Sequence, residues 1–152
     1  MSESVAIQNQ RIADNIREHG WHCLHVFPNV EGQEKFSYSV GFTESYGAPE
    51  VLIFGLEREK AHALLNECAN LFKNGHKIAP EAEDSNVLAG DYSVVFKSIR
   101  PEFFGEYLGT AIRYYQERPF TAAVMFIPDR AHHFAWQQGY SDIPADEALA
   151  IV

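Results

Sequence analysis

The chain has 152 residues, of which 46% are hydrophobic and 22% are charged, a balance that suits one folded domain and argues against disorder. Its net charge of −9 disfavours nucleic-acid binding, because contact with phosphates needs clustered Lys and Arg, and the 12 basic residues are scattered. No apolar run approaches the length of a membrane span and the N-terminus has no signal-peptide pattern, so we expect a single cytoplasmic domain over 1–152 that contacts no membrane.

The N-terminal part of the chain predicts a helix followed by a strand. Residues 4–18 place apolar side chains at near-helical spacing among polar ones, and Gly20 is suited to end such a helix. The apolar stretch 21–28 that follows predicts a strand, which ends at Pro28.

Residues 36–56, FSYSVGFTESYGAPEVLIFGL, predict the central hairpin of a sheet. In the first strand, large apolar side chains alternate with the small residues Ser37, Ser39 and Gly41. The second strand is apolar over 51–54 without alternation, which suits a strand covered on both faces. We call the side of this strand that carries Ser37, Ser39 and Gly41 the small face. Because its side chains are small, we expect something bulky to lie against it, namely a packed helix, an aromatic side chain of a neighbouring strand, or a ligand.

The second half of the chain predicts two more helices and two more strands. Residues 57–74 and 101–116 carry apolar stripes typical of helices, and residues 91–99 and 121–128 predict strands. The segment 76–90 is a loop long enough to be functional or mobile, and the tail has no clear period.

The order of these elements predicts the fold class. Early consecutive strands joined by short turns favour antiparallel pairing. We therefore expect an α+β fold with a single mixed or mainly antiparallel sheet of about five strands and three helices packed on it.

The histidines and cysteines predict neither a metal site nor a disulfide. His22 and His25 lie three apart in a predicted strand, so their side chains point to opposite faces and do not meet without a bulge. Cys23 and Cys68 predict two reduced thiols, since disulfides are rare in cytosolic proteins.

No motif predicts a catalytic site, and the sequence leaves open whether the protein has any catalytic activity. The hydroxyls and thiol near the small face lie neither in a Gly-x-Ser-x-Gly elbow nor beside a recognisable base. A flavin-like or other planar ligand against the small face is an alternative, although no cofactor is predicted by a binding signature. The candidate residues for such a ligand are Trp21, His22, Ser37, Ser39 and Gly41.

An acidic segment and an aromatic tail predict a protein-binding surface. The acidic residues of 81–91 have no basic residue among them, and a surface of one sign attracts a basic partner, although it also serves solubility alone. The tail interleaves aromatic and polar side chains, which is typical both of interfaces and of core caps. The candidate partner-binding residues are Glu81, Glu83, Asp84, Asp91, Phe134, Trp136 and Tyr140.

Four short motifs resemble a bacterial protein family known only as a domain of unknown function. The motifs are Gly20-Trp21, FSYSVGF at 36–42, a Gly-x-Pro-Glu step at 47–50 and VLIFGL at 51–56. The family's usual pattern is Gly-Trp, Tyr-Thr-Val-Gly-Leu, Pro-Glu-Leu and Gly-Leu, from which this chain departs at Ser39 and Phe42. The resemblance covers 12–75 well and implies a small cytoplasmic bacterial protein, and it supplies no catalytic residues.

These observations favour binding of another protein without catalysis. An acidic domain is suited to cover a basic enzyme, so an immunity-type inhibitor that neutralises a basic bacterial toxin domain is the form that we expect. The alternative is a small-molecule or cofactor-binding domain, or a small enzyme, built on the small-residue face. The oligomeric state is left open.

Overall fold

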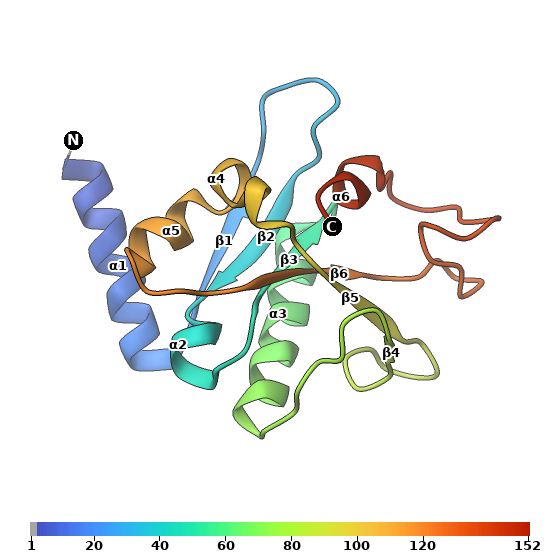
Figure 1. Cartoon of the computed structure of the whole chain (residues 1–152), viewed down its shortest axis with the longest axis horizontal. Coiled ribbons are helices and arrows are strands. Elements are labelled where there is room, and N and C mark those ends of the chain that lie inside the picture. Colours follow the sequence, from blue (N-terminus) through green and yellow to red (C-terminus); the bar gives the residue numbers. More distant parts are fainter. Residues whose placement is uncertain (1–2) are drawn as a thin grey trace.

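One open sheet runs through the protein, with helices on both of its faces, in the computed structural model, which describes residues 3–152 (Figure 1). The strands are β1 (His22–Val26), β2 (Phe36–Val40), β3 (Glu50–Phe54), β4 (Glu83–Asp84), β5 (Val94–Ser98) and β6 (Ala122–Phe126). The helices are α1 (Glu3–His19), α2 (Phe42–Tyr46), α3 (Arg58–Lys73), α4 (Phe104–Tyr107), α5 (Gly109–Tyr115) and α6 (Asp146–Ala150).

The sheet is mixed, with the strand order β1-β2-β3-β6-β5-β4. Only β3 and β6 pair in parallel, and every other neighbouring pair is antiparallel. The predicted α+β class and mixed sheet are therefore confirmed. The predicted count of five strands and three helices is too low, because residues 3–152 form six strands and six α-helices.

The missing elements are all short. The strand β4 has two residues and lies inside the segment predicted as a loop, and α6 has five residues in the tail. The predicted helix over 101–116 is wrong as one unit, because a 3-10 turn at Pro101–Phe103 precedes α4 and α5. Gly105 and Gly109 weaken helix formation in this segment, and Leu108 lies between the two α-helices with a non-helical φ of −118°.

The hairpin predicted at 36–56 is confirmed, since β2 and β3 pair directly and β3 is buried along its whole length. Its connection holds the short helix α2, which the sequence did not predict. Gly41 and Gly47 flank this helix with φ values of 118° and 67°, a region that residues other than glycine rarely adopt.

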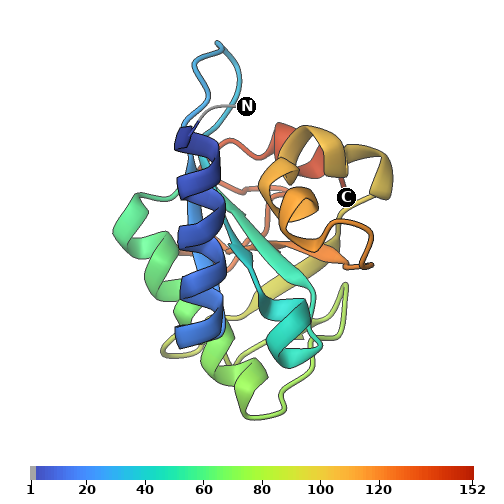
Figure 2. The ribbon, with the colours of Figure 1, turned by 90° about the vertical axis from the view of Figure 1, so that its left-hand side faces the viewer.

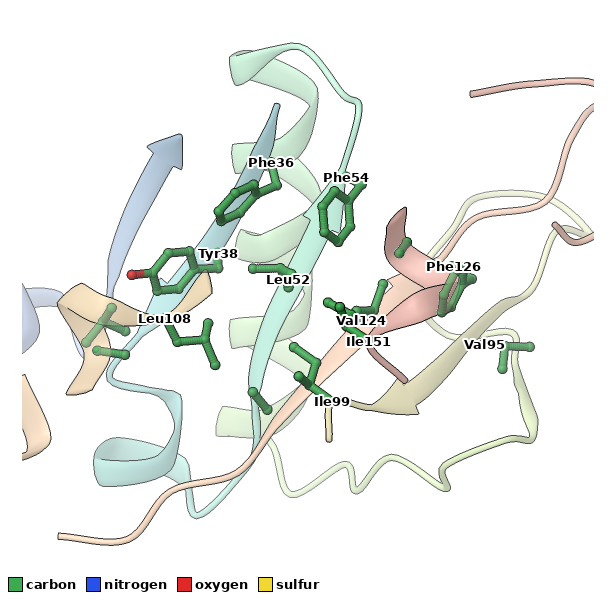
Figure 3. Packing of buried hydrophobic residues seen from close by; sticks show 14 of the residues in the cluster. Phe36, Tyr38, Leu52, Phe54, Val95, Ile99, Leu108, Val124, Phe126 and Ile151 are labelled. Carbon is green, nitrogen blue, oxygen red and sulfur yellow. The ribbon is translucent and has the colours of Figure 1, made fainter. Parts of the chain in front are cut away.

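Two apolar layers hold the helices on the sheet. On one face, α1, α5 and α6 pack on side chains of β2, β3, β5 and β6, and Figure 3 shows Phe36, Tyr38, Leu52 and Val124 projecting into this layer. On the other face, α3 packs on β3, β5 and β6 through a second cluster that includes Leu65. None of the helices within 3–152 has the length and apolar character needed to cross a membrane.

Candidate functional site

The small face of β2 is covered by the protein itself. Ser37 and Ser39 are buried, and a Cβ on Gly41 would lie 2.8 Å from the carbonyl oxygen of Gly20 and 3.0 Å from the Cα of Trp21. The neighbour of Gly41 is therefore the Gly20-Trp21 backbone just before β1, which approaches too closely for any side chain.

Ser39 and the amides around Gly41 bind a carboxylate that the sequence analysis did not single out as functional. Glu50 begins β3 and is fully buried. Ser39 Oγ donates to its Oε1 at 2.7 Å, and the backbone N–H groups of Gly41, Phe42 and Thr43 donate at 3.1, 3.1 and 3.2 Å. The hydroxyl of Tyr115, from α5, also donates to Oε2.

The Glu50 network has a structural role. Burial raises the pKa of the Glu50 carboxyl above its ordinary value, while the hydroxyl and amide donors oppose this effect. Every partner is a donor, so the surroundings satisfy the ionised carboxylate with hydrogen bonds. The carboxylate joins β2, α2, β3 and α5, and no solvent reaches it.

A polar groove lies between α1 and α3, with β1 at its floor. It encloses about 690 Å³, within the range of small-molecule sites. Figure 2 looks onto this side of the molecule, with α1 at the front and α3 beside it. The groove is lined by Asn15, Glu18, His19, Trp21, His22, Cys23, His25, His62, Asn66 and Lys73.

The histidines of β1 are held in place by hydrogen bonds from opposite sides of the sheet. His22 Nδ1 lies 2.8 Å from Nδ2 of Asn15 in α1, whereas His25 Nδ1 lies 2.7 Å from Oγ of Ser37 in β2. On the α3 side, Trp21 and His62 stack with ring centroids 5.5 Å apart. The opposite orientation predicted for His22 and His25 agrees with these partners.

The electrostatics of the groove favour neutral side chains on β1. Burial is the main cause that lowers the pKa of His22 and of His25, and the nearby Arg11 and Arg58 contribute. Burial also raises the pKa of the Cys23 thiol to about 12, so this sulfur is protonated at neutral pH. Within 3–152 no three His, Cys, Asp or Glu side chains converge to hold a metal ion, and both cysteines are free.

The residues predicted to bind a planar ligand fall into two groups in the structure, one that lines the groove and one that is buried. Trp21 and His22 line the groove, whereas Ser37, Ser39 and Gly41 are buried behind it in the hydrogen bonds and contacts described above. Ser37 contacts the groove lining through its hydrogen bond to His25. The accessible chemistry of the groove consists of imidazole and amide hydrogen-bonding groups, the Lys73 ammonium and the Glu18 carboxylate.

The residues predicted for a protein partner lie near the opposite edge of the sheet and differ in exposure. Glu81, Glu83 and Asp91 are exposed, but Asp84 is buried and its Oδ2 lies 2.7 Å from Nε2 of His76. Burial raises the pKa of Asp84, but the hydrogen bonds from His76 and Asn86 outweigh it and hold this pKa below the ordinary value. Asp84 therefore stabilises the conformation of its loop through these hydrogen bonds.

The aromatic tail lies over β5 and β6. Phe134 is buried and stacks on Trp136 with ring centroids 5.1 Å apart, whereas Trp136 stays 40% exposed. Lys97 Nζ lies 4.1 Å from the centre of the Trp136 ring and 3.3 Å from Oε1 of Glu81. The structure thus brings Glu81 and the tail together, which their separation of more than fifty residues did not reveal.

The last two predicted residues, Asp91 and Tyr140, have separate partners. Asp91 Oδ2 is 3.9 Å from Nε2 of His132, whose ring stacks on Tyr92 at 4.3 Å. The Tyr140 hydroxyl donates to the carbonyl of Ile143 at 3.0 Å, so it fixes the turn of the tail.

A comparison with protein-family models matches residues 15–141 to a domain of unknown function, DUF4262. The chain belongs to this family. The match includes the Glu50 network, the groove and most of the aromatic tail, and it agrees with the resemblance to a domain of unknown function. Neither the curated proteins nor the solved structures gave a match.

Glu50 and Tyr115 are the structural residues that sequence reasoning missed. The signal for Glu50 was present, because a single acidic residue opens an otherwise apolar buried strand directly after Pro49. The apolar stripe of 101–116 placed Tyr115 on the inward face, but no signal paired it with Glu50, which lies 65 residues away.

Proposed function

We propose that this protein is a binding domain without catalysis, which recognises another protein through the surface formed by Glu81, Glu83, Asp91 and Trp136. We call this the acidic surface. Its partner is a protein with a basic contact face, since a surface rich in carboxylates favours cationic partners and speeds their association.

Trp136 is the observation that supports this proposal most. An exposed tryptophan held in a fixed orientation is the type of residue that contributes most to protein interfaces. Trp136 is fixed by Phe134 beneath it and by Lys97 over its ring, and Lys97 is also the ion partner of Glu81. A partner that contacts Trp136 would meet the neighbouring carboxylates at the same time.

The charge of the region favours an inhibitor as the specific form of this function. The protein carries a net charge of −9, and Asp91, 88% exposed, and Glu83 have no strong salt bridge. Such carboxylates are available to pair with arginine or lysine around the active site of a basic enzyme. Neutralisation of a basic toxin domain, in the manner of an immunity protein, is the form that we propose.

Partner capture with matched variants tests this function. The wild-type protein, Trp136→Ala and an Asp91→Lys/Glu83→Lys double variant are immobilised and exposed to native lysate, with Glu59→Lys on the distant helix α3 as the control. We expect a stoichiometric basic protein to bind the wild type and the control and to be lost from both surface variants. Capture that the surface variants leave undiminished would contradict the proposal, as would the absence of any stoichiometric partner.

A further inference from the structure

The strand β1 is an open edge of the sheet. It pairs with β2 on one side, and no further strand lies beyond it in the part of the chain that the structure describes. All five of its residues, His22–Val26, are partly buried. In antiparallel pairing, alternate residues direct their N–H and C=O groups away from the neighbouring strand, so β1 presents such groups to the groove.

The groove has the dimensions of an extended peptide. On its α3 wall, His62, Asn66 and Lys73 fall within about 40° of the helix circumference, beside the buried stripe of that helix. The distance along the axis from His62 to Lys73 is about 16 Å, which corresponds to about five residues of extended chain. The α1 wall presents polar side chains, among them Asn15 and His19.

The groove lining carries one ammonium, Lys73, and one carboxylate, Glu18, and two further basic side chains lie near the β1 histidines. These two, Arg11 and Arg58, lie close enough to the histidines to act on them electrostatically. A ligand with negative side chains on its α3-facing side would therefore find complementary charge there, and hydrogen-bonding imidazoles along the floor.

We propose that the groove between α1 and α3 binds an extended acidic segment of another protein, which adds to β1 as a further strand. Main-chain hydrogen bonds to β1 supply affinity, as in other complexes formed by strand addition. Alternate side chains of the segment face α3, where carboxylates pair with Lys73 and Arg58, and the intervening side chains face α1. This site lies at the opposite edge of the sheet from the acidic surface and does not depend on it.

Synthetic peptides test the site without knowledge of the natural partner. The probes are a fluorescent Glu-Val-Glu-Val-Glu-Val-Glu peptide and its Lys-Val counterpart, whose binding is followed by fluorescence polarisation at low ionic strength. We expect the acidic peptide to bind at least about tenfold more tightly than the basic one. Lys73→Glu should remove this preference, whereas Lys60→Glu, an equal charge change on the outer face of α3, should leave it.

Two N-methylated versions of the acidic peptide test the strand pairing. Methylation of the valine amides and methylation of the glutamate amides block opposite edges of the peptide, so only one version should lose binding. Equal binding of both versions would overturn strand addition, and equal binding of the acidic and basic peptides would overturn the assignment of charge. Absence of binding by either peptide would overturn the proposal, as would a dimer of the protein that occupies β1 and excludes the peptide in sedimentation experiments.

Discussion

The two edge strands of the sheet, β4 and β1, differ in length and in their surroundings. At one edge, β4 has only two residues, and the adjoining Glu81 donates its backbone N–H to Phe96 at 2.9 Å. The other edge, β1, has five partly buried residues and lies at the floor of a groove. Proteins commonly protect sheet edges by keeping them short and charged, so β4 is protected in the usual way and β1 is not.

This difference indicates how the two edges recognise other molecules. Near β4, recognition is expected through side chains, because carboxylates and the Trp136 ring are exposed there. At β1, the backbone itself is available, and basic and hydrogen-bonding side chains flank it. An open edge invites aggregation, but α1 and α3 flank β1 on either side of the groove.

The largest expected effect comes from the Glu50 carboxylate, which anchors the strands behind the β1 edge. Glu50→Ala leaves five buried donors without their partner and should reduce the free energy of unfolding by about 3–5 kcal/mol. Urea denaturation measures this change. Glu83→Ala at the exposed β4 edge is the matched control, with an expected change below about 0.5 kcal/mol. A similar small loss for both variants would show that Glu50 is not an anchor.

The second prediction separates core from surface at the tail near the β4 edge. Phe134→Ala should cost about 3 kcal/mol, because the ring is buried and the truncation leaves a cavity. Trp136→Ala should cost about 1 kcal/mol or less while it abolishes partner capture, since the indole is 40% exposed. Thermal and urea unfolding measure both. If Trp136→Ala lost as much stability as Phe134→Ala, the indole would be part of the core rather than of the surface.

The third prediction concerns the close approach of β1 to Gly41. Gly41→Ala combines a φ of 118° with a Cβ that would contact the backbone of Gly20 and Trp21, and should cost about 2–3 kcal/mol. Gly32→Ala is the control, because Gly32 has a φ of 87° but no atom within 4 Å of the added Cβ, and about 1 kcal/mol is expected. Equal losses in urea denaturation would mean that conformation alone, and not contact with β1, requires glycine at this site.

The smallest expected effect is a different response of the two edges to acid. Burial lowers the folded-state pKa of His22 and His25 below 6.5, so the unfolded chain binds more protons below about pH 6.5, and stability falls as the pH decreases through that range. The pKa of Asp84 is lowered below 3.8, so its contribution is complete above that value and is lost only as the pH falls further, through the lowered pKa.

Unfolding measured by urea between pH 7.5 and pH 3 distinguishes the two edges. A His22→Gln/His25→Gln variant should flatten the slope of stability against pH just below pH 6.5, and Asp84→Asn should flatten it only at the acidic end. The pH assignment would be wrong if the histidine variant retained the full slope near pH 6.

The sequence predicted those parts of the fold that depend on local pattern. Alternation in 36–40 and the apolar run 51–54 correctly placed β2 and β3, because strand period and burial are expressed residue by residue. The helix α2 was missed because its five residues are too few to show a period, and the only trace of it is the pair of glycines at its ends.

The candidate sites depend on contacts between distant segments, which one sequence does not reveal. The groove exists because α1 and α3 pack on opposite faces of the sheet beside β1, and no local pattern encodes this arrangement. The link between Glu81 and Trp136 through Lys97 is likewise a product of the fold. The exposed aromatic and acidic residues themselves could be nominated from the sequence, because their chemistry is a property of single residues.

Amide hydrogen exchange at residue resolution, with and without the Glu-Val peptide, tests the contrast between the edges most directly. In the free protein, we expect the β1 amides that point away from β2 to exchange quickly, and in the presence of the peptide we expect them to become protected while β4 is unchanged. Outward β1 amides that are already protected in the free protein, or that the peptide leaves unprotected, would contradict the account of β1 as an open docking edge.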